Sequence, residues 1–206
     1  LSPGRFQYPP QSVAVMMNLM DSHDTIRFLT SSGDVSRLML GAMFSMTYVG
    51  MPHIWYGNEV GMVGGKDPDC RRPFDWSYEG DPRRKGLRDY YGQITRLRRD
   101  TAVLSRGSFT SLTAEGRAYV FARELDGELA VAMFNAGPSP VTLTLSSETL
   151  QQIAGAGATM VFKTEVGPEL FPRASGASFQ TGDKLDLRGG DAQVTLPGMS
   201  GAILLN

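Results

Sequence analysis

The order of apolar and polar positions divides the chain into two parts with different patterns. In residues 1 to about 100, a nearly continuous apolar run, 13–20, is typical of a strand buried on both faces of a parallel sheet. Residues 52–57, PHIWYG, predict a second short buried strand. Between them, Asp34 is a candidate helix cap. The apolar residues that follow it have helical spacing: Val35, Leu38, Met39, Ala42, Met43 and Met46.

A long polar loop, from Asn58 to about Gly80, follows the second predicted strand. Asp81 and Pro82 then suit the cap and the first turn of another helix. The apolar stripe of this helix is Leu87, Tyr90, Tyr91, Ile94 and Leu97. Alternating strands and helices are typical of a parallel α/β sheet or barrel, although two such units cannot close a barrel, which needs eight.

The second part of the chain consists of short strand-like runs separated by turn residues. Asp126-Gly127 lies between two such runs and is a strong hairpin signal. Residues 141–145, VTLTL, alternate apolar residues with threonine, and TMVFKT, AQVTLP and GAILLN predict further strands. This pattern predicts an antiparallel β-sandwich. The boundary falls near residues 101–107, so we assign residues 1–104 to the first domain and 105–206 to the second.

Composition narrows the function classes. The 206 residues carry a formal net charge of −1, which provides no electrostatic case for binding nucleic acid or an anionic membrane. No apolar run approaches the roughly 18 residues of a membrane-spanning helix. The single cysteine, Cys70, fits a cytosolic protein. The opening residues, LSPGRFQYPPQ, are typical of a loop inside a longer chain, so we expect a fragment.

Polar residues gather where the two predicted strands end. The segment 21–27, DSHDTIR, ends the first strand, and the long loop follows the second. Because carboxyl ends of parallel strands share one rim, we expect these side chains there. Carboxylates beside aromatic rings suit a polyhydroxylated ligand, since hydroxyls form hydrogen bonds and rings pack on the C–H face of a sugar. The rim residues are His23, Asp24, Arg27, Trp55, Tyr56, Glu59, Asp67, Asp69, Arg71, Arg72, Phe74 and Trp76.

Structural roles for the same residues remain open at this level. His23 and Asp24 also suit a cap of the next helix. The acidic and basic residues of 67–72 also suit an ion-pair cluster that holds a long loop, and Trp55 also suits the core. No cofactor is predicted. A metal site is not predicted either, because His23 and His53 are the only imidazoles and no calcium-loop spacing is present.

Two long motifs resemble the alpha-amylase family, glycoside hydrolase family 13. MNLMDSHDTIRFLT resembles the segment after the seventh barrel strand, and VGMPHIWYGNEVGMVGGKDPDCRRPFDW resembles the eighth strand with its loop. The form GGKDPDCRRPFDW is similar to the neopullulanase, cyclomaltodextrinase and maltogenic amylase branch. The resemblance implies an α/β plus all-β fold: the last two βα units of a TIM (β/α)8 barrel, followed by an antiparallel C-terminal β-sandwich. Asn58 departs from the branch, which usually has aspartate there.

The resemblance also implies roles for four residues. Asp24 matches the family's third catalytic carboxylate, which binds the glucose unit at the cleavage point and favours its oxocarbenium-like form. His23 matches a donor to the same sugar. Asp67 and Arg71 match a pair that holds the neighbouring glucose unit. An α-glucan or maltooligosaccharide is therefore the expected substrate.

A retaining glycosidase also needs a nucleophile and a general acid. In the family these come from strands four and five, and no residue here matches either motif. We therefore expect the 206-residue chain to be inactive by itself and to need the missing N-terminal part of the barrel. The parent is expected to hydrolyse α-1,4 bonds of cyclomaltodextrins, pullulan or maltooligosaccharides with retention. Its localisation stays open, and the cytoplasm is favoured because it fits the branch and the single Cys70. The alternative is a non-catalytic amylase-like subunit or a glucan-binding or structural module.

Overall fold

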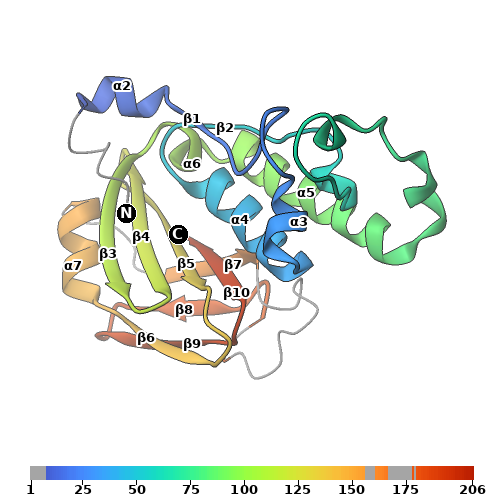
Figure 1. Ribbon diagram of the computed structural model, residues 1–206. Helices are drawn as coiled ribbons and strands as arrows, with labels where there is room; N and C mark the ends of the chain where they lie inside the picture. Colours follow the sequence, from blue (N-terminus) through green and yellow to red (C-terminus); the bar gives the residue numbers. More distant parts are fainter. Residues whose placement is uncertain (1–7, 156–160, 167–177, 179) are drawn as a thin grey trace. The chain divides into compact units, whose positions relative to one another are not determined.

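The computed structural model describes residues 8–155, 161–166, 178 and 180–206 (Figure 1). The chain divides into two units, Leu1–Asp100 and Thr101–Asn206. The division precedes the short helix α6 (Ala102–Arg106), whereas the sequence pattern placed residues up to 104 in the first domain. α6 belongs with the second unit because Leu104 is buried there and its carbonyl accepts a hydrogen bond from Arg123 Nη1 at 2.7 Å.

The first unit is built on a parallel strand–helix–strand arrangement. β1 (Met17–Asn18) pairs with β2 (Met51–Pro52), Met17 lying opposite Met51, and α3 (Phe28–Ser32) and α4 (Val35–Thr47) connect the two strands. The short helix α2 (Pro10–Ala14) precedes β1. After β2 come three 3-10 helices and a long helix: η1 (Asn58–Val60), η2 (Asp69–Arg71), η3 (Trp76–Gly80) and α5 (Pro82–Asp100).

The two predicted strands of this unit are much shorter than the apolar runs that predicted them. The run 13–20 contains the end of α2 and only two strand residues, and 53–57 lie outside β2. Val15, Met17 and Leu19 are exposed, so the expectation of burial on both faces was wrong for this chain. Among the described residues, β1 and β2 form a sheet of two strands, so the flanking backbone has no second partner to extend the ladder.

Helices α4 and α5 confirm the helical patterns and lie side by side (Figure 1). Asp34 caps α4 by accepting a hydrogen bond from the Ser36 backbone N–H at 2.8 Å. The predicted apolar face of α4 is buried except for Val35, which is exposed. α5 begins at Pro82, and Asp81 Oδ1 accepts from the Arg83 backbone N–H at 2.8 Å. Both caps satisfy backbone N–H groups that have no partner inside the helix.

In its described residues, the second unit contains two antiparallel sheets and two short helices. The hairpin signal at Asp126-Gly127 is confirmed, because both residues have positive φ (54° and 87°) and join β4 to β5. α7 (Ser147–Ala154), capped by Ser146, was not predicted. The larger sheet has the order β3 (Ser108–Glu115), β4 (Ala118–Leu125), β5 (Glu128–Asn135), β10 (Ser200–Leu205), β7 (Val161–Val166) and β8 (Lys184–Asp186), and the smaller sheet pairs β6 (Val141–Leu145) with β9 (Ala192–Leu196).

One apolar cluster joins both sheets and α7. Strand residues of the larger sheet, such as Val131 and Met133, pack with Leu143 and Leu196 of the smaller sheet and with Leu150 of α7. These side chains are almost completely buried. The second unit therefore encloses a core of its own. In the described parts of both units, no helix has the length and apolarity that a membrane crossing requires.

Candidate active site

The candidate site lies on the two loops that follow β1 and β2. Because these strands are parallel, both loops leave the same edge of the strand pair. Buried Asp21 ties the loops together. Its Oδ1 accepts a hydrogen bond from Asn58 Nδ2 at 2.6 Å, and its Oδ2 accepts from the Phe28 N–H, the first of α3, at 2.7 Å. The side chain that accepts from the first N–H of α3 is therefore that of Asp21, and not that of His23 or Asp24, which the sequence offered as a possible cap.

Arg27 holds the aromatic residues behind the site. Its side chain is completely buried, and Nη1 donates to the Tyr56 carbonyl at 2.7 Å. The guanidinium carbon lies 4.9 Å from the centre of the Tyr56 ring and 5.8 Å from that of Trp55, which is cation–π distance. The Arg27 backbone N–H donates to the Gly64 carbonyl at 3.1 Å. Arg27 therefore links the first loop to both ends of the segment 56–64.

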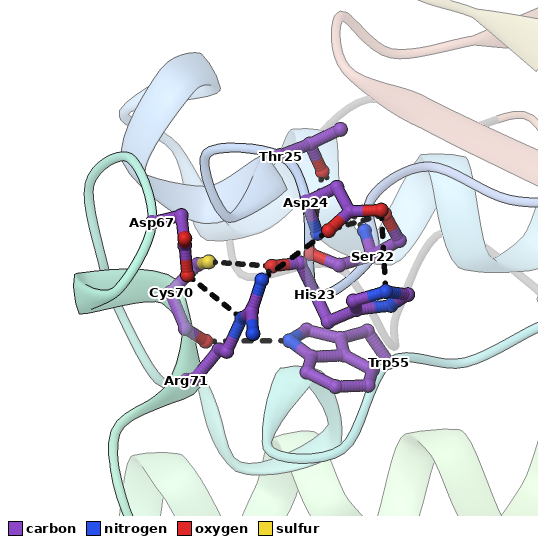
Figure 2. A network of polar contacts seen from close by, with 8 residues as sticks. All are labelled: Ser22, His23, Asp24, Thr25, Trp55, Asp67, Cys70 and Arg71. Atoms are coloured by element: carbon purple, nitrogen blue, oxygen red, sulfur yellow. Dashed lines mark hydrogen bonds and ion pairs between the residues drawn. The ribbon is translucent and has the colours of Figure 1, made fainter.

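Arg71 brings all four predicted site residues into one network, which Figure 2 shows. Its Nε lies 2.8 Å from Asp67 Oδ1 and also donates to the His23 carbonyl at 3.0 Å. Its Nη2 lies 3.3 Å from Asp24 Oδ1, and His23 Nε2 lies 3.2 Å from the other oxygen of Asp24. The Arg71 and Asp24 side chains remain 46% and 67% exposed, so they are accessible to a ligand.

Neighbouring residues fix the backbone of His23 and Asp24. Buried Cys70 donates from Sγ to the His23 carbonyl at 3.0 Å. Trp55 Nε1 donates to the Cys70 carbonyl at 3.4 Å, and the Trp55 ring centre lies 5.9 Å from that of His23 (Figure 2). The Asp24 backbone N–H donates to Ser22 Oγ at 3.2 Å. These contacts present the imidazole and the carboxylate outward beside an indole ring.

The charged residues of the long loop divide between two tasks. Asp69 and Arg72 form an ion pair at 2.6 Å within the loop. The pKa of Asp69 lies below its usual value because the Gly65 backbone N–H and Arg72 stabilise the carboxylate. This pair acts as the loop brace that the sequence allowed. Arg71 both braces its own loop, by pairing with Asp67 four residues away, and links that loop to the other one, by reaching Asp24.

Glu59 does not belong to the exposed network, although the sequence placed it on the same rim. One of its oxygens, Oε2, is buried without a hydrogen-bond partner among the described residues. Burial, together with the charges of Asp21 and Glu59, raises the pKa of Tyr91. Glu59 is therefore half-buried and acts on the buried Tyr91 rather than on the exposed network. In the described ranges, no group of three or more histidine, cysteine or acidic residues could hold a metal ion.

Sequence reasoning missed the pairing of Asp21 with Asn58. The signal was the departure at Asn58, where the family branch usually has aspartate. Beside the Asp21 carboxylate, an amide donates a hydrogen bond, whereas an aspartate would place two carboxylates in contact.

Comparisons with known proteins agree with this geometry. Residues 7–93 match the alpha-amylase catalytic domain. The chain is 42% identical over 147 residues to neopullulanase 2 of Thermoactinomyces vulgaris, a match that covers 69% of this chain and 25% of that protein. It is 45% identical over 122 residues to a cyclomaltodextrinase of Thermoanaerobacter pseudethanolicus, covering 59% of this chain and 21% of that protein.

Among solved structures, the debranching enzyme of Nostoc punctiforme superposes with a TM-score of 0.76 at 29% identity, covering 98% of this chain and 38% of that chain. The chain spans about a quarter of the length of the curated relatives named above. These two relatives carry names that the motif GGKDPDCRRPFDW indicated. Residues 7–93, which hold the whole Asp24–Arg71 network, thus belong to a catalytic domain of the alpha-amylase family.

Proposed function

We propose that this chain is part of a retaining glycoside hydrolase that cleaves α-1,4-glucosidic bonds in cyclomaltodextrins, pullulan or maltooligosaccharides. One observation carries the proposal: Arg71 joins Asp24 to Asp67, although these aspartates lie on different loops. The names of the relatives, neopullulanase and cyclomaltodextrinase, support this choice of substrates.

In the proposed mechanism, Asp24 accepts hydrogen bonds from hydroxyls of the glucose unit at the cleavage point. As the bond breaks, positive charge develops on the ring, and hydrogen bonds to a carboxylate strengthen relative to the ground state. Interactions that strengthen only in the transition state raise the rate of the chemical step. His23 donates to the same sugar from its imidazole, which lies against the Trp55 ring.

Arg71 and Asp67 hold the next glucose unit. Arg71 already contacts the Asp24 carboxylate at 3.3 Å, so it restrains that side chain before the sugar arrives. Such restraint lowers the reorganisation that catalysis requires. Asp67 keeps more than half of its side-chain surface exposed and offers acceptor oxygens to sugar hydroxyls beside the guanidinium.

The first unit is proposed to be the last two βα units of a (β/α)8 barrel, and the second unit a C-terminal β-sandwich. The parallel pairing of β1 with β2 and the exposed apolar side chains along them support the barrel assignment. A mostly apolar groove of about 570 Å³ runs beside β1 and is lined by Met17, Leu19, Phe28 and Phe44. The missing N-terminal part of the barrel would cover this surface and would supply the nucleophile and the general acid.

An assay of sugar release tests whether the nucleophile and the general acid lie outside these 206 residues. The 206-residue chain alone is expected to release no reducing sugar from β-cyclodextrin or pullulan. Release of sugar by the chain alone would mean that the nucleophile and acid lie within these residues.

In the longer protein that carries the chain, Asp24→Asn is expected to lower kcat about a hundredfold or more, because several kcal/mol of transition-state stabilisation are lost. KM should change little. Asp69→Asn is the matched control, since Asp69 is also a solvent-accessible aspartate paired with an arginine, but its partner is Arg72 and it makes no contact with Asp24. Its kcat should stay within about twofold. An Asp24→Asn protein with unchanged kcat would exclude the catalytic role of Asp24 and would make this chain a glucan-binding or structural part of an enzyme whose catalytic groups lie elsewhere.

A further inference from the structure

A second surface of the first unit combines an exposed aromatic ring with hydrogen-bonding groups. Trp76, the first residue of η3, is 69% exposed, and its ring centre lies 4.7 Å from that of Phe74. Phe74 also meets Tyr78 edge to face at 6.0 Å. An open hollow of about 610 Å³ is lined by Phe74 and also by Val63, Arg72, Asp75 and Arg84. Trp76 is outside this lining and adjoins the hollow through its contact with Phe74. This volume lies in the range of small-molecule sites, roughly 300–1,000 Å³.

Each charged side chain that lines the hollow has an ion-pair partner. Arg84 Nη1 lies 2.9 Å from Asp75 Oδ2, and Arg72 Nε lies 2.6 Å from Asp69 Oδ1. The pKa of Asp75 is held below its usual value by hydrogen bonds from Ser77 and by Arg84, so this carboxylate is ionised at neutral pH. The hollow therefore offers several donors and acceptors without excess charge of either sign. Such a surface suits a neutral, hydroxyl-rich ligand better than a phosphate or an acidic peptide.

The turn that carries Trp76 is fixed from two sides. Asp75 Oδ1 accepts hydrogen bonds from the Ser77 backbone N–H at 3.0 Å and from Ser77 Oγ at 2.6 Å. The other oxygen of Asp75 pairs with Arg84 of α5, whose Nε also donates to the Val60 carbonyl at 2.7 Å. The indole is thus presented on a restrained turn. A ring held in place binds with less loss of conformational entropy than a mobile one.

We propose that Trp76, Phe74 and the adjoining hollow form a second binding site for an α-glucan chain, separate from the Asp24–Arg71 network. The aromatic faces would pack on the C–H side of glucose rings, and Arg72, Asp75 and Arg84 would bind hydroxyls. Arg71 and Arg72 are consecutive, yet Arg71 contacts Asp24 whereas Arg72 lines the hollow, so the two sites share one loop. The choice of an α-glucan as ligand rests on the proposed function.

The chain has two tryptophans, Trp55 beside His23 and Trp76 beside the hollow, so each site carries its own fluorescent reporter. Trp55→Phe leaves Trp76 as the reporter of the hollow, and Trp76→Phe leaves Trp55 as the reporter of the Asp24 network. Each variant is titrated with maltohexaose and, as a control for linkage, with the β-linked cellohexaose. We expect a saturable change in Trp76 emission with maltohexaose that is at least fivefold weaker with cellohexaose.

A further pair of variants tests whether the hollow itself binds the sugar. In the Trp55→Phe background, Phe74→Ala should weaken the maltohexaose response at least fivefold. Glu79→Gln, an exposed position of η3 outside the hollow, should leave it unchanged. Trp55 is partly buried, so replacing it by phenylalanine can disturb the fold. The unmodified chain is therefore also titrated with maltohexaose, and binding is followed by NMR through the N–H signals of its two indole rings. The signal that disappears in the Trp76→Phe protein belongs to Trp76.

The outcomes separate the two proposals. A Trp76 signal that stays constant while Trp55 responds would overturn the second site and leave the proposed function intact. A response of Trp76 without one of Trp55 would support the second site and contradict the sugar contact proposed for the Asp24 network. A constant signal from both tryptophans would overturn both proposals.

Discussion

The two units differ in how completely they bury their own apolar side chains. Among the described residues, the large hydrophobic side chains that are exposed all lie in the first unit, and several line β1 and β2: Val15, Met16, Met17, Leu19 and Met51. The second unit encloses one apolar cluster between its two sheets and α7. Contiguous exposed apolar surface usually marks an interaction site. The comparison teaches that the second unit buries its apolar side chains internally, whereas the first unit leaves apolar side chains along β1 and β2 exposed, as the proposed completion of the barrel requires.

Strand pairing shows the same difference. Each of β1 and β2 has two residues, and a sheet of two short strands is marginal in water. In the second unit, β4 pairs along its whole length with β5 and also with β3. Backbone hydrogen bonds therefore support the second unit across several strands, while the first unit depends on its helices.

The largest effect is expected when the units are separated. Residues 101–206 expressed alone should unfold cooperatively with a free energy of roughly 5 kcal/mol or more, as is usual for a small domain. Residues 1–100 alone should show no cooperative transition, because the apolar surface along β1 and β2 stays exposed. Circular dichroism during urea titration measures both. Cooperative unfolding of 1–100 together with failure of 101–206 to fold would reverse the comparison.

Two arginines, one in each unit, test the same comparison with an effect of intermediate size on the free energy of unfolding. Buried Arg123 donates to the carbonyls of Leu104, Gly107 and Ser108 at 2.7–2.9 Å. Partly buried Arg98 donates to the carbonyls of Met46, Tyr48 and Gly50, in the last turn of α4 and just after it, at 2.7–3.2 Å. In the full chain, Arg123→Met should lower the free energy of unfolding by about 3 kcal/mol, since buried carbonyls lose charged donors that water cannot replace.

Arg98→Met should cost only about 1–2 kcal/mol, because water reaches part of that site. Arg188→Met is the control, since Arg188 pairs with Asp186 in solvent and should give no measurable loss. Urea unfolding of the three variants ranks their losses in the free energy of unfolding. Equal losses for Arg98 and Arg123 would show that exposure does not separate the two units.

The smallest effect concerns two neighbouring tyrosines of α5. Tyr90 and Tyr91 are both buried, and the Tyr90 hydroxyl donates to the Met39 carbonyl at 2.8 Å. The Tyr91 hydroxyl has no hydrogen-bond partner among the described residues. Tyr90→Phe should therefore cost about 1 kcal/mol, and Tyr91→Phe should be neutral or slightly stabilising. Urea unfolding of both variants measures the two changes in the free energy of unfolding. Equal losses would mean that the Tyr91 hydroxyl has a hydrogen-bond partner in solution.

Local signals in the sequence were enough for much of the fold. Asp34 and Pro82 marked the starts of α4 and α5, and Asp126-Gly127 marked the β4–β5 turn. These features depend on residues within a few positions of one another, so a short window contains their cause. The extents of β1 and β2 were overestimated, because an apolar run measures a tendency to be buried and cannot show which surface is present to bury it.

The sequence by itself determined the helical faces, the turns, the family motifs and the residues that carry the candidate chemistry. Only the tertiary structure decided which of these residues meet. Arg71 reaches Asp24 across 47 positions, and Asn58 reaches Asp21 across 37, because parallel pairing of β1 with β2 brings their loops to one edge. It also decided that Glu59 is partly buried behind the network and that Trp76 is exposed beside a hollow. The physical reason is that such contacts depend on how distant segments pack, which no local pattern of residues records.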